Sequence, residues 1–508
     1  MEKRYDAIII GAGHNGLIAA TYLGKKGKKV VVLEKNTFPG GLATRTEFHT
    51  GYRSPGILQD SSLLDYKVVQ DLGLESKGLV IQNQRPEIML LGRNHDEILL
   101  EQDAEKSVAA IARHSKKDAQ RYRDYLQFIQ DIRPFIQSVF SNMPPDLSGF
   151  APGQVMKLGQ LGWKLRRLGK ATMLQLLKVA PMCVSDFLDE YFETDLLKSG
   201  LSFPALLGSF TSPRSAYTTL NLLMWDCRSN CYLPGGPAAL IDSLLKAAES
   251  LGVEVKMDSK VKSIHFDDKN CVEGIALENG DTYLSPIVLS SATPRHTFFD
   301  LVPNYQLSFE LEHDVKNYRS RGMTAKMNLA LDRIPAQVKA SIIRLGSDWA
   351  TMELAFDPSK YRQIPEEPTL ELSIPSLGDP QLAPEGHAVL SILAHHIPYN
   401  LEGGWTDAAK TTLSQAILSA LDSYLPGISE TIVGSEIITP QDLENNYGLT
   451  EGQIFHGEHA IDQILARPIP SCARYATPLA GLFLCGSGTF PGGGITGAPG
   501  RLATEAIR

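Results

Sequence analysis

Three glycines near the start of the chain have the spacing of a phosphate-binding turn. They lie in the run Gly11-Ala12-Gly13-His14-Asn15-Gly16. Gly11 permits a tight turn, Gly13 lets backbone N–H groups approach a pyrophosphate, and Gly16 lets the next helix pack closely on the preceding strand. Glu34 follows 18 residues after Gly16, near the spacing of about 20 at which a carboxylate accepts hydrogen bonds from an adenosine ribose. The pattern therefore predicts a dinucleotide site.

The elements that would position these residues flank the glycines on both sides. The apolar run Tyr5–Ile10 predicts a strand before them, and the run Val30–Leu33 predicts a second strand that ends at the carboxylate. Between the two, one apolar face at helical spacing is formed by Leu17, Ala20 and Leu23. Strand, glycine turn, helix and strand in this order favour a dinucleotide fold over an isolated turn.

A second glycine-rich segment lies near the other end of the chain. It follows an apolar run at Leu482–Cys485, and six glycines fall between Gly486 and Gly497. Glycines leave backbone N–H groups uncovered, and a helix that begins near Thr496 would direct its positive end at this loop. Such a helix end would stabilise negative charge on a bound group.

Motifs along the whole chain resemble those of the phytoene dehydrogenase-related flavoproteins. They are Gly-Ala-Gly-His-Asn-Gly-Leu at 11–17, Gly-Gly-Pro-Ala-Ala-Leu at 235–240, Ser-Ala-Thr-Pro-Arg at 291–295, Thr439–Glu444, Phe455–Glu458 and Cys485–Gly494. The likeness is stronger to the branch named for a pyridine nucleotide-disulphide oxidoreductase domain than to bacterial-type phytoene desaturases. It implies an α/β fold, with a Rossmann-like FAD-binding domain of the glutathione-reductase and amine-oxidase type interleaved with an α+β substrate domain.

The resemblance also implies that the cofactor is FAD. In these flavoproteins a second glycine turn follows the ribose-binding carboxylate and runs along the extended cofactor, and Pro39–Arg45 is that turn here. Related proteins commonly bind the ribityl chain with an Asp, where this chain has Ser487. The residues expected at the cofactor are Gly11, Ala12, Gly13, His14, Asn15, Gly16, Glu34, Lys35, Gly41, Leu42, Ala43, Val261, Gly486, Ser487, Ile495 and Thr496. No second strand, glycine turn and helix unit is found for a nicotinamide, and no metal site is expected.

The activity that the resemblance implies is oxidation at C–H bonds of an apolar small molecule, such as a polyene or isoprenoid, by hydride transfer to flavin N5. Desaturation and flavin-assisted double-bond isomerisation both fit. A flavin amine oxidase-like enzyme and a flavin-binding interaction protein with little turnover are the alternatives. His456 and Tyr475 are the candidate catalytic side chains, with His456 as a proton acceptor or, alternatively, as a structural hydrogen bonder. Phe490 replaces a histidine common in phytoene desaturases, so a role for that histidine does not transfer.

The cofactor domain is expected to be discontinuous. Its three parts would be residues 1–60, 233–298 and 451–508. Residues 61–232 are predicted to form a mostly helical insertion, and residues 299–450 a mixed α/β substrate domain. A helix is expected at Pro237–Leu251, followed by short strands.

Composition excludes several classes of protein. A net charge of −8 over 508 residues, with no basic aromatic-rich tract, lacks the footprint of a nucleic-acid-binding protein. Six scattered cysteines favour reduced thiols and a cytoplasmic location, and the one close pair, Cys227 and Cys231, is interpreted as structural. No apolar run approaches the ~20 residues of a membrane span. The oligomeric state stays open.

Residues 151–180 carry a net positive charge, whereas the chain as a whole has a net negative charge. They include no acidic residue and six basic ones, Lys157, Lys164, Arg166, Arg167, Lys170 and Lys178. A basic amphipathic helix that also carries Trp163 can lie on the inner, anionic face of a membrane, and this would suit a substrate dissolved in lipid. The alternative is a core-facing helix with a solvated basic face, and Gly159, Gly162 and Gly169 weaken a continuous helix here.

Overall fold

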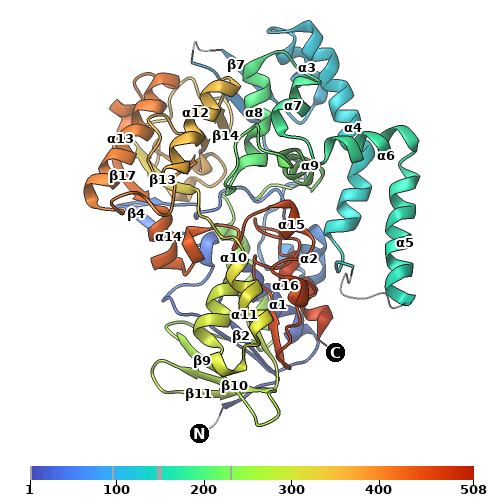
Figure 1. The fold of residues 1–508 in the computed structure, drawn as a ribbon. Coiled ribbons are helices and arrows are strands. Elements are labelled where there is room, and N and C mark those ends of the chain that lie inside the picture. The colour runs from blue at the N-terminus through green and yellow to red at the C-terminus, as the bar shows by residue number, and fades with distance from the viewer. Residues whose placement is uncertain (1–2, 94–95, 146–151, 229–230, 508) are drawn as a thin grey trace.

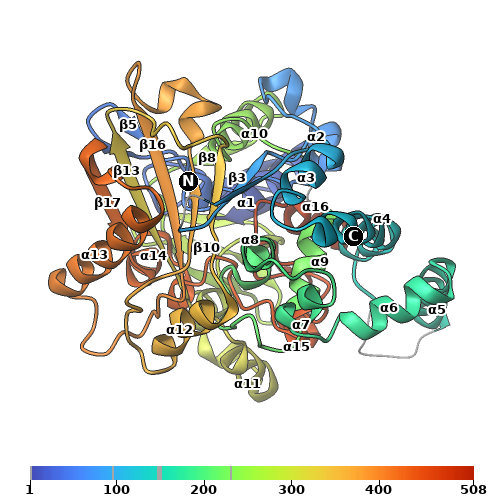
Figure 2. The ribbon, with the colours of Figure 1, turned by 90° about the horizontal axis from the view of Figure 1, so that it is seen from above.

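The structure is a computed structural model that describes residues 3–93, 96–145, 152–228 and 231–507. Two large sheets lie in different halves of the described part of the molecule, and helices pack around both (Figures 1 and 2). A smaller sheet lies beside the first of them, at the end of the molecule that also holds the N-terminus.

The first large sheet is parallel and has the strand order β18-β12-β2-β3-β8. Its strands are β2 (Ala7–Ile10), β3 (Val30–Leu33), β8 (Glu254–Lys256), β12 (Val288–Ser290) and β18 (Leu482–Leu484). Every residue of β2 and β3 is buried, because the sheet is covered on both faces. Such strands read as continuous apolar runs rather than as an alternating pattern.

Different elements pack on the two faces of this sheet. Ile9 and Val32 point into a core shared with three helices, which are α1 (His14–Lys25), α10 (Ala238–Ser250) and α16 (Ala498–Ala506). Ile8 and Val31 point the other way, toward the smaller sheet. The strands of that sheet are β1 (Lys3–Arg4), β9 (Val261–Phe266), β10 (Val272–Leu277) and β11 (Thr282–Leu284). The alternation follows from the two-residue period of a strand.

The second large sheet is mixed, with the order β17-β13-β16-β15-β14-β6-β7. Its strands are β6 (Ile88–Leu91), β7 (Glu97–Leu100), β13 (Thr324–Leu331), β14 (Ile342–Leu345), β15 (Leu370–Ser373), β16 (Ala388–His395) and β17 (Ile432–Ile438). Helix α13 (Asp407–Tyr424) packs on this sheet through Leu413, Ile417 and Leu421. The sheet forms the second core of the molecule.

The remaining described elements are mostly helical. They are β4 (Glu47–His49), β5 (Tyr52–Arg53), α2 (Tyr66–Leu72), α3 (Ala104–Ile111), α4 (Lys116–Phe140), α5 (Pro152–Arg167), α6 (Lys170–Val179), α7 (Val184–Asp189), α8 (Asp195–Leu206), α9 (Thr218–Arg228), α11 (Phe309–Asn317), α12 (Trp349–Lys360), α14 (Pro440–Tyr447) and α15 (Ile461–Ile464). Ser115 caps α4 by accepting a hydrogen bond from the Asp118 N–H. Among the described residues, no helix combines the length and the apolar content that crossing a membrane requires.

Most of the elements expected near the glycine turns are confirmed. The strand Val30–Leu33 has the expected bounds, and the helix expected at Pro237–Leu251 covers Ala238–Ser250. The strand before the first glycine turn, β2, begins at Ala7 instead of Tyr5. One difference affects the substrate region: the segment 61–232, expected to be mostly helical, also supplies β6 and β7 to the second sheet. β6 pairs in parallel with β14, whose residues lie far away in the sequence.

Candidate functional site

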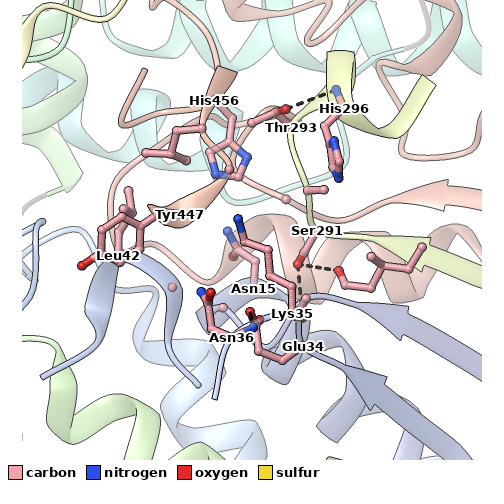
Figure 3. A pocket seen from close by; sticks show the side chains of 18 of the residues that line it. Asn15, Glu34, Lys35, Asn36, Leu42, Ser291, Thr293, His296, Tyr447 and His456 are labelled. Carbon is pink, nitrogen blue, oxygen red and sulfur yellow. Dashed lines mark hydrogen bonds between the residues drawn. The ribbon is translucent and has the colours of Figure 1, made fainter. Parts of the chain in front are cut away.

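A cavity of about 310 Å³ opens at the carboxyl ends of four parallel strands of the first sheet (Figure 3). This is the edge at which ligands bind in open α/β sheets. The sequence-predicted residues that line it are Gly11, Gly13, His14, Asn15, Glu34, Lys35, Gly41, Leu42, Val261, Gly486, Ser487 and His456. Glu34 and Asn36 lie at one end of the view, and Thr293 and His456 at the other.

The first glycine turn has the geometry that a close backbone approach needs. Gly11 has a φ of 94°, in the left-handed region. A Cβ on Gly16 would stand 2.1 Å from the Gly11 carbonyl oxygen, so only glycine allows this packing of α1 against the turn. A Cβ on Gly13 would meet no atom within 4 Å. Gly13 therefore borders open space in the wall of the cavity.

Glu34 is held firmly by the backbone around it. Its Oε2 accepts a hydrogen bond from the Ala12 N–H at 2.7 Å, and its Oε1 accepts one from the Asn36 N–H at 2.9 Å. The side chain is only 7% exposed. Because each carboxylate oxygen can accept more than one hydrogen bond, Glu34 retains acceptors for ribose hydroxyls while it fixes the turn.

Polar atoms without partners line the same cavity. They are His14 Nε2, Asn15 Oδ1 and His456 Nδ1, all fully buried. Burial lowers the pKa of His14 to about 4 and that of His456 to about 3, so both imidazoles are neutral at neutral pH. Buried polar groups nearly always have partners, and these three atoms would find them in a bound dinucleotide. The residues present therefore fit such a group.

The C-terminal loop closes this site from the opposite end of the sequence. Asn15 Nδ2 donates a hydrogen bond to Ser487 Oγ at 3.1 Å, and the Gly494 backbone hydrogen-bonds to the His14 ring. Ser487, which stands where related flavoproteins have an Asp, thus borders the cavity and contacts the start of α1. The N-terminal and C-terminal segments together form one wall.

Six sequence-predicted residues lie outside the cavity lining: Ala12, Gly16, Ala43, Ile495, Thr496 and Tyr475. Thr496 and Ile495 are fully buried just before α16, which begins at Ala498. Their contact with a cofactor, like that of the lining residues, stays a prediction. Ala12 acts on the site through its N–H, which donates to Glu34.

The two candidate catalytic residues are placed differently. His456 lines the cavity with its Nδ1 unpartnered, and burial lowers its pKa to about 3, so it accepts a proton poorly at neutral pH. Both of its expected roles, proton acceptor and structural hydrogen bonder, stay predictions. Tyr475 is fully buried, and its hydroxyl donates to the Phe490 carbonyl at 2.7 Å. That contact gives Tyr475 a structural task away from the cavity.

Lys326 is a buried residue that the sequence patterns did not single out. It lies in β13 with no exposed surface, and its Nζ donates to Gln59 Oε1 at 2.8 Å. Burial lowers its pKa to about 7, although the carboxylates of Glu371 and Glu436 act in the opposite direction. The sequence contains a signal for it, because Lys326 stands between the apolar residues Ala325 and Met327 of a fully buried strand.

A second cavity, of about 350 Å³, lies between the helical region and the second sheet. Apolar and charged groups share its lining, among them Ile129, Leu201, Trp225, Arg133, Arg344 and Asp60. Leu58 lines the first cavity and Asp60 the second, so the short segment 58–60 borders both. This arrangement places the second cavity beside the first.

The six cysteines are free thiols in the described chain. Cys227 and Cys231 are free thiols, and burial raises the pKa of each to about 12. Their sulfurs donate to backbone carbonyls, which agrees with the structural interpretation. No group of three or more His, Cys, Asp or Glu side chains among the described residues is arranged to hold a metal ion.

The chain is similar to known oxidoreductases over its whole length. A model of the NAD(P)-binding Rossmann-like domain matches residues 9–61. The chain is 32% identical to pyridine nucleotide-disulfide oxidoreductase domain-containing protein 2 of Rattus norvegicus, over 100% of this chain and 94% of that protein. It is 28% identical to one of the subunits of limonene dehydrogenase from Castellaniella defragrans, over 99% and 94% of the two chains.

More distant similarities extend over the same length. Identity to the lycopene-forming phytoene desaturase of Pantoea ananas is 25%, over 98% of this chain and 97% of that protein. Among solved structures, an oxidoreductase from Methanosarcina mazei matches 99% of both chains with a TM-score of 0.59 and 15% identity. That structural likeness agrees with the expected fold.

Proposed function

This chain belongs to the family of pyridine nucleotide-disulfide oxidoreductase domain-containing protein 2, and from that membership we propose that it is an FAD-dependent oxidoreductase acting on C–H bonds of an apolar small molecule. Membership makes it an oxidoreductase with a Rossmann-like domain. The observation that supports a dinucleotide cofactor is the cavity at the carboxyl ends of the strands. Its wall combines the first glycine turn, Glu34 and the C-terminal loop.

The position of the second glycine turn supports FAD. The Gly40 N–H donates to the Ala12 carbonyl at 2.8 Å, and a bridge pairs Gly13 with Gly40. The turn expected along FAD therefore lies directly against the turn expected at the pyrophosphate. Leu42 and Leu58 continue the wall of the first cavity. Leu58 lies two residues before Asp60, which lines the second cavity.

The proposed substrate class is supported by the names of two relatives. Limonene and phytoene, for which two of the relatives are named, are hydrocarbons without an ionisable group. Bound FAD would supply a hydride acceptor for a C–H bond. The protein would supply apolar contacts from Leu126, Ile129 and Trp225. Desaturation and double-bond isomerisation both remain compatible with this arrangement.

We expect the protein to purify yellow and to release FAD, not FMN, on denaturation. The reason is that Glu34 and the glycine turn form an adenosine and pyrophosphate site, and FMN lacks the adenosine half. Chromatography of the released flavin against both standards measures this. A colourless protein that takes up no FAD on reconstitution would refute the proposal.

In anaerobic mixing, we expect NADH and NADPH to reduce the flavin slowly or not at all, because the sequence has no second strand, glycine turn and helix unit for a nicotinamide. Isoprenoid hydrocarbons in detergent micelles should instead bleach the flavin or yield an isomer. Primary amines serve as the comparison substrates. Fast bleaching by amines alone would favour the amine oxidase alternative, and fast bleaching by NADH would show that a nicotinamide site was overlooked.

A further inference from the structure

Helices α5 and α6 form an arm at the edge of the molecule. Both views place it on the side opposite α13, with α5 outermost (Figures 1 and 2). Gly169, with a φ of 87°, separates the two helices, whereas Gly159 and Gly162 lie inside α5 without interrupting it. Leu176 and Val179 anchor α6 in the helical core. No side chain of α5 from Val155 to Arg167 is buried.

The arm exposes an unusual amount of apolar surface. Of the 17 exposed large hydrophobic residues in the described chain, six lie between Val155 and Leu177. Met156 is 62% exposed and Trp163 60% exposed. They stand seven residues apart, so they share one face of α5 across two turns. Clustered exposed apolar residues indicate an interaction surface more often than isolated ones do.

The charges around this apolar face are positive. Among the described residues, Lys178 is the only one of the six basic side chains in 151–180 that lies within salt-bridge distance of a carboxylate, that of Glu190. The Arg167 guanidinium lies over the Trp163 ring, 4.7 Å from its centroid. Lys157 and Arg166 are exposed. A helix with exposed tryptophan and methionine and a basic flank is complementary to an anionic lipid surface, where the apolar groups enter the interface and the cations meet the headgroups.

We propose that α5 and α6 dock this protein onto the surface of an anionic lipid bilayer. The evidence is the coincidence of exposed apolar residues with uncompensated positive charge in a chain of net charge −8. Docking needs neither the flavin nor the reaction proposed above, so it can hold or fail by itself. An enzyme placed in this way would meet an apolar substrate where that substrate dissolves.

The test is co-sedimentation of the full-length flavoprotein with vesicles. One set contains phosphatidylcholine and phosphatidylglycerol, and the other phosphatidylcholine alone. We expect binding to the anionic set only, and at least a tenfold loss of bound protein at high salt, because charge attraction to the headgroups is screened. Wild-type protein that stays in the supernatant with anionic vesicles would overturn the proposal.

Two variants and a matched control locate the surface. In the first, Lys164, Arg166, Arg167 and Lys170 are replaced by Gln, and in the second Trp163→Ala leaves the charge unchanged. Both should lose vesicle binding while keeping the FAD content of the wild type. The control removes the same charge elsewhere, by replacing the exposed Lys28, Lys262, Lys269 and Lys316 by Gln, and should bind normally. Docking through this arm would be contradicted if the control lost as much vesicle binding as the two variants. It would also be contradicted if the variants bound vesicles normally and changed only their oligomeric state in gel filtration.

Discussion

Replacing Glu34 by alanine is expected to abolish retention of FAD through purification. The substitution removes the carboxylate that would accept ribose hydrogen bonds, and it also leaves the N–H groups of Ala12 and Asn36 without their acceptor. An unsatisfied buried donor such as the Ala12 N–H costs about 1–3 kcal/mol. The partly buried Asn36 N–H loses its acceptor as well, so the glycine turn is loosened together with the ribose contact. The ratio of flavin to protein after gel filtration measures the effect.

Two further variants separate binding from turn stability. Glu34→Gln keeps one oxygen acceptor but presents an NH₂ group to the other donor, so an intermediate flavin content is expected. Glu249→Ala, on the exposed face of α10, is the matched control and should retain FAD. If Glu34→Ala protein carries a full complement of FAD, the carboxylate has only the structural role seen in its backbone hydrogen bonds.

The second large effect is expected to be a gain in stability when Lys326 is replaced by methionine. The pKa of Lys326 is lowered from 10.5 to about 7 by burial. Between these values the unfolded chain binds a proton that the folded chain does not, so wild-type stability rises with pH across this interval and is lowest below it. At about 1.4 kcal/mol per pKa unit, the deficit at neutral pH is of order 3–5 kcal/mol, and loss of the Gln59 hydrogen bond offsets about 1 kcal/mol of the gain.

Urea unfolding of the flavin-free proteins from pH 6 to 9 tests this. The two curves of midpoint against pH should converge as pH rises, because the wild type gains stability and the variant does not. Lys316→Met, at an exposed position of α11, is the control and should parallel the wild type. Parallel curves for Lys326→Met would mean that the lysine retains its charge in the folded protein.

Local patterns predicted the parts of the site that depend on nearby residues. The glycines were recognisable because the positive φ of Gly11 and the close packing of Gly16 arise within a single strand, turn and helix unit. The strand Val30–Leu33 was recognisable because burial on both faces makes the whole run apolar. Both features are set by spacing that the sequence displays directly.

Long-range contacts determined what the patterns missed. Lys326 reaches Gln59 across 267 positions, and no local periodicity encodes that contact. β6 pairs on one side with the nearby β7 and on the other with the distant β14, whereas four apolar residues alone do not distinguish a strand from a buried helical turn. The Tyr475 hydroxyl donates to the Phe490 carbonyl, a contact that depends on how the chain folds back and that no local pattern encodes.

The wall shared by the two ends of the chain has a consequence for biosynthesis. Asn15 and Glu34 are made early, whereas Ser487, which completes their side of the cavity, follows Glu34 by 453 positions. At roughly 5–20 residues per second, a ribosome needs about 20–90 s to bridge that interval. Throughout this time the nascent chain has the first glycine turn but not the loop that closes over it. A chain that ends before the last strand of the parallel sheet would therefore lack Gly486 and Ser487, which complete the wall of this cavity.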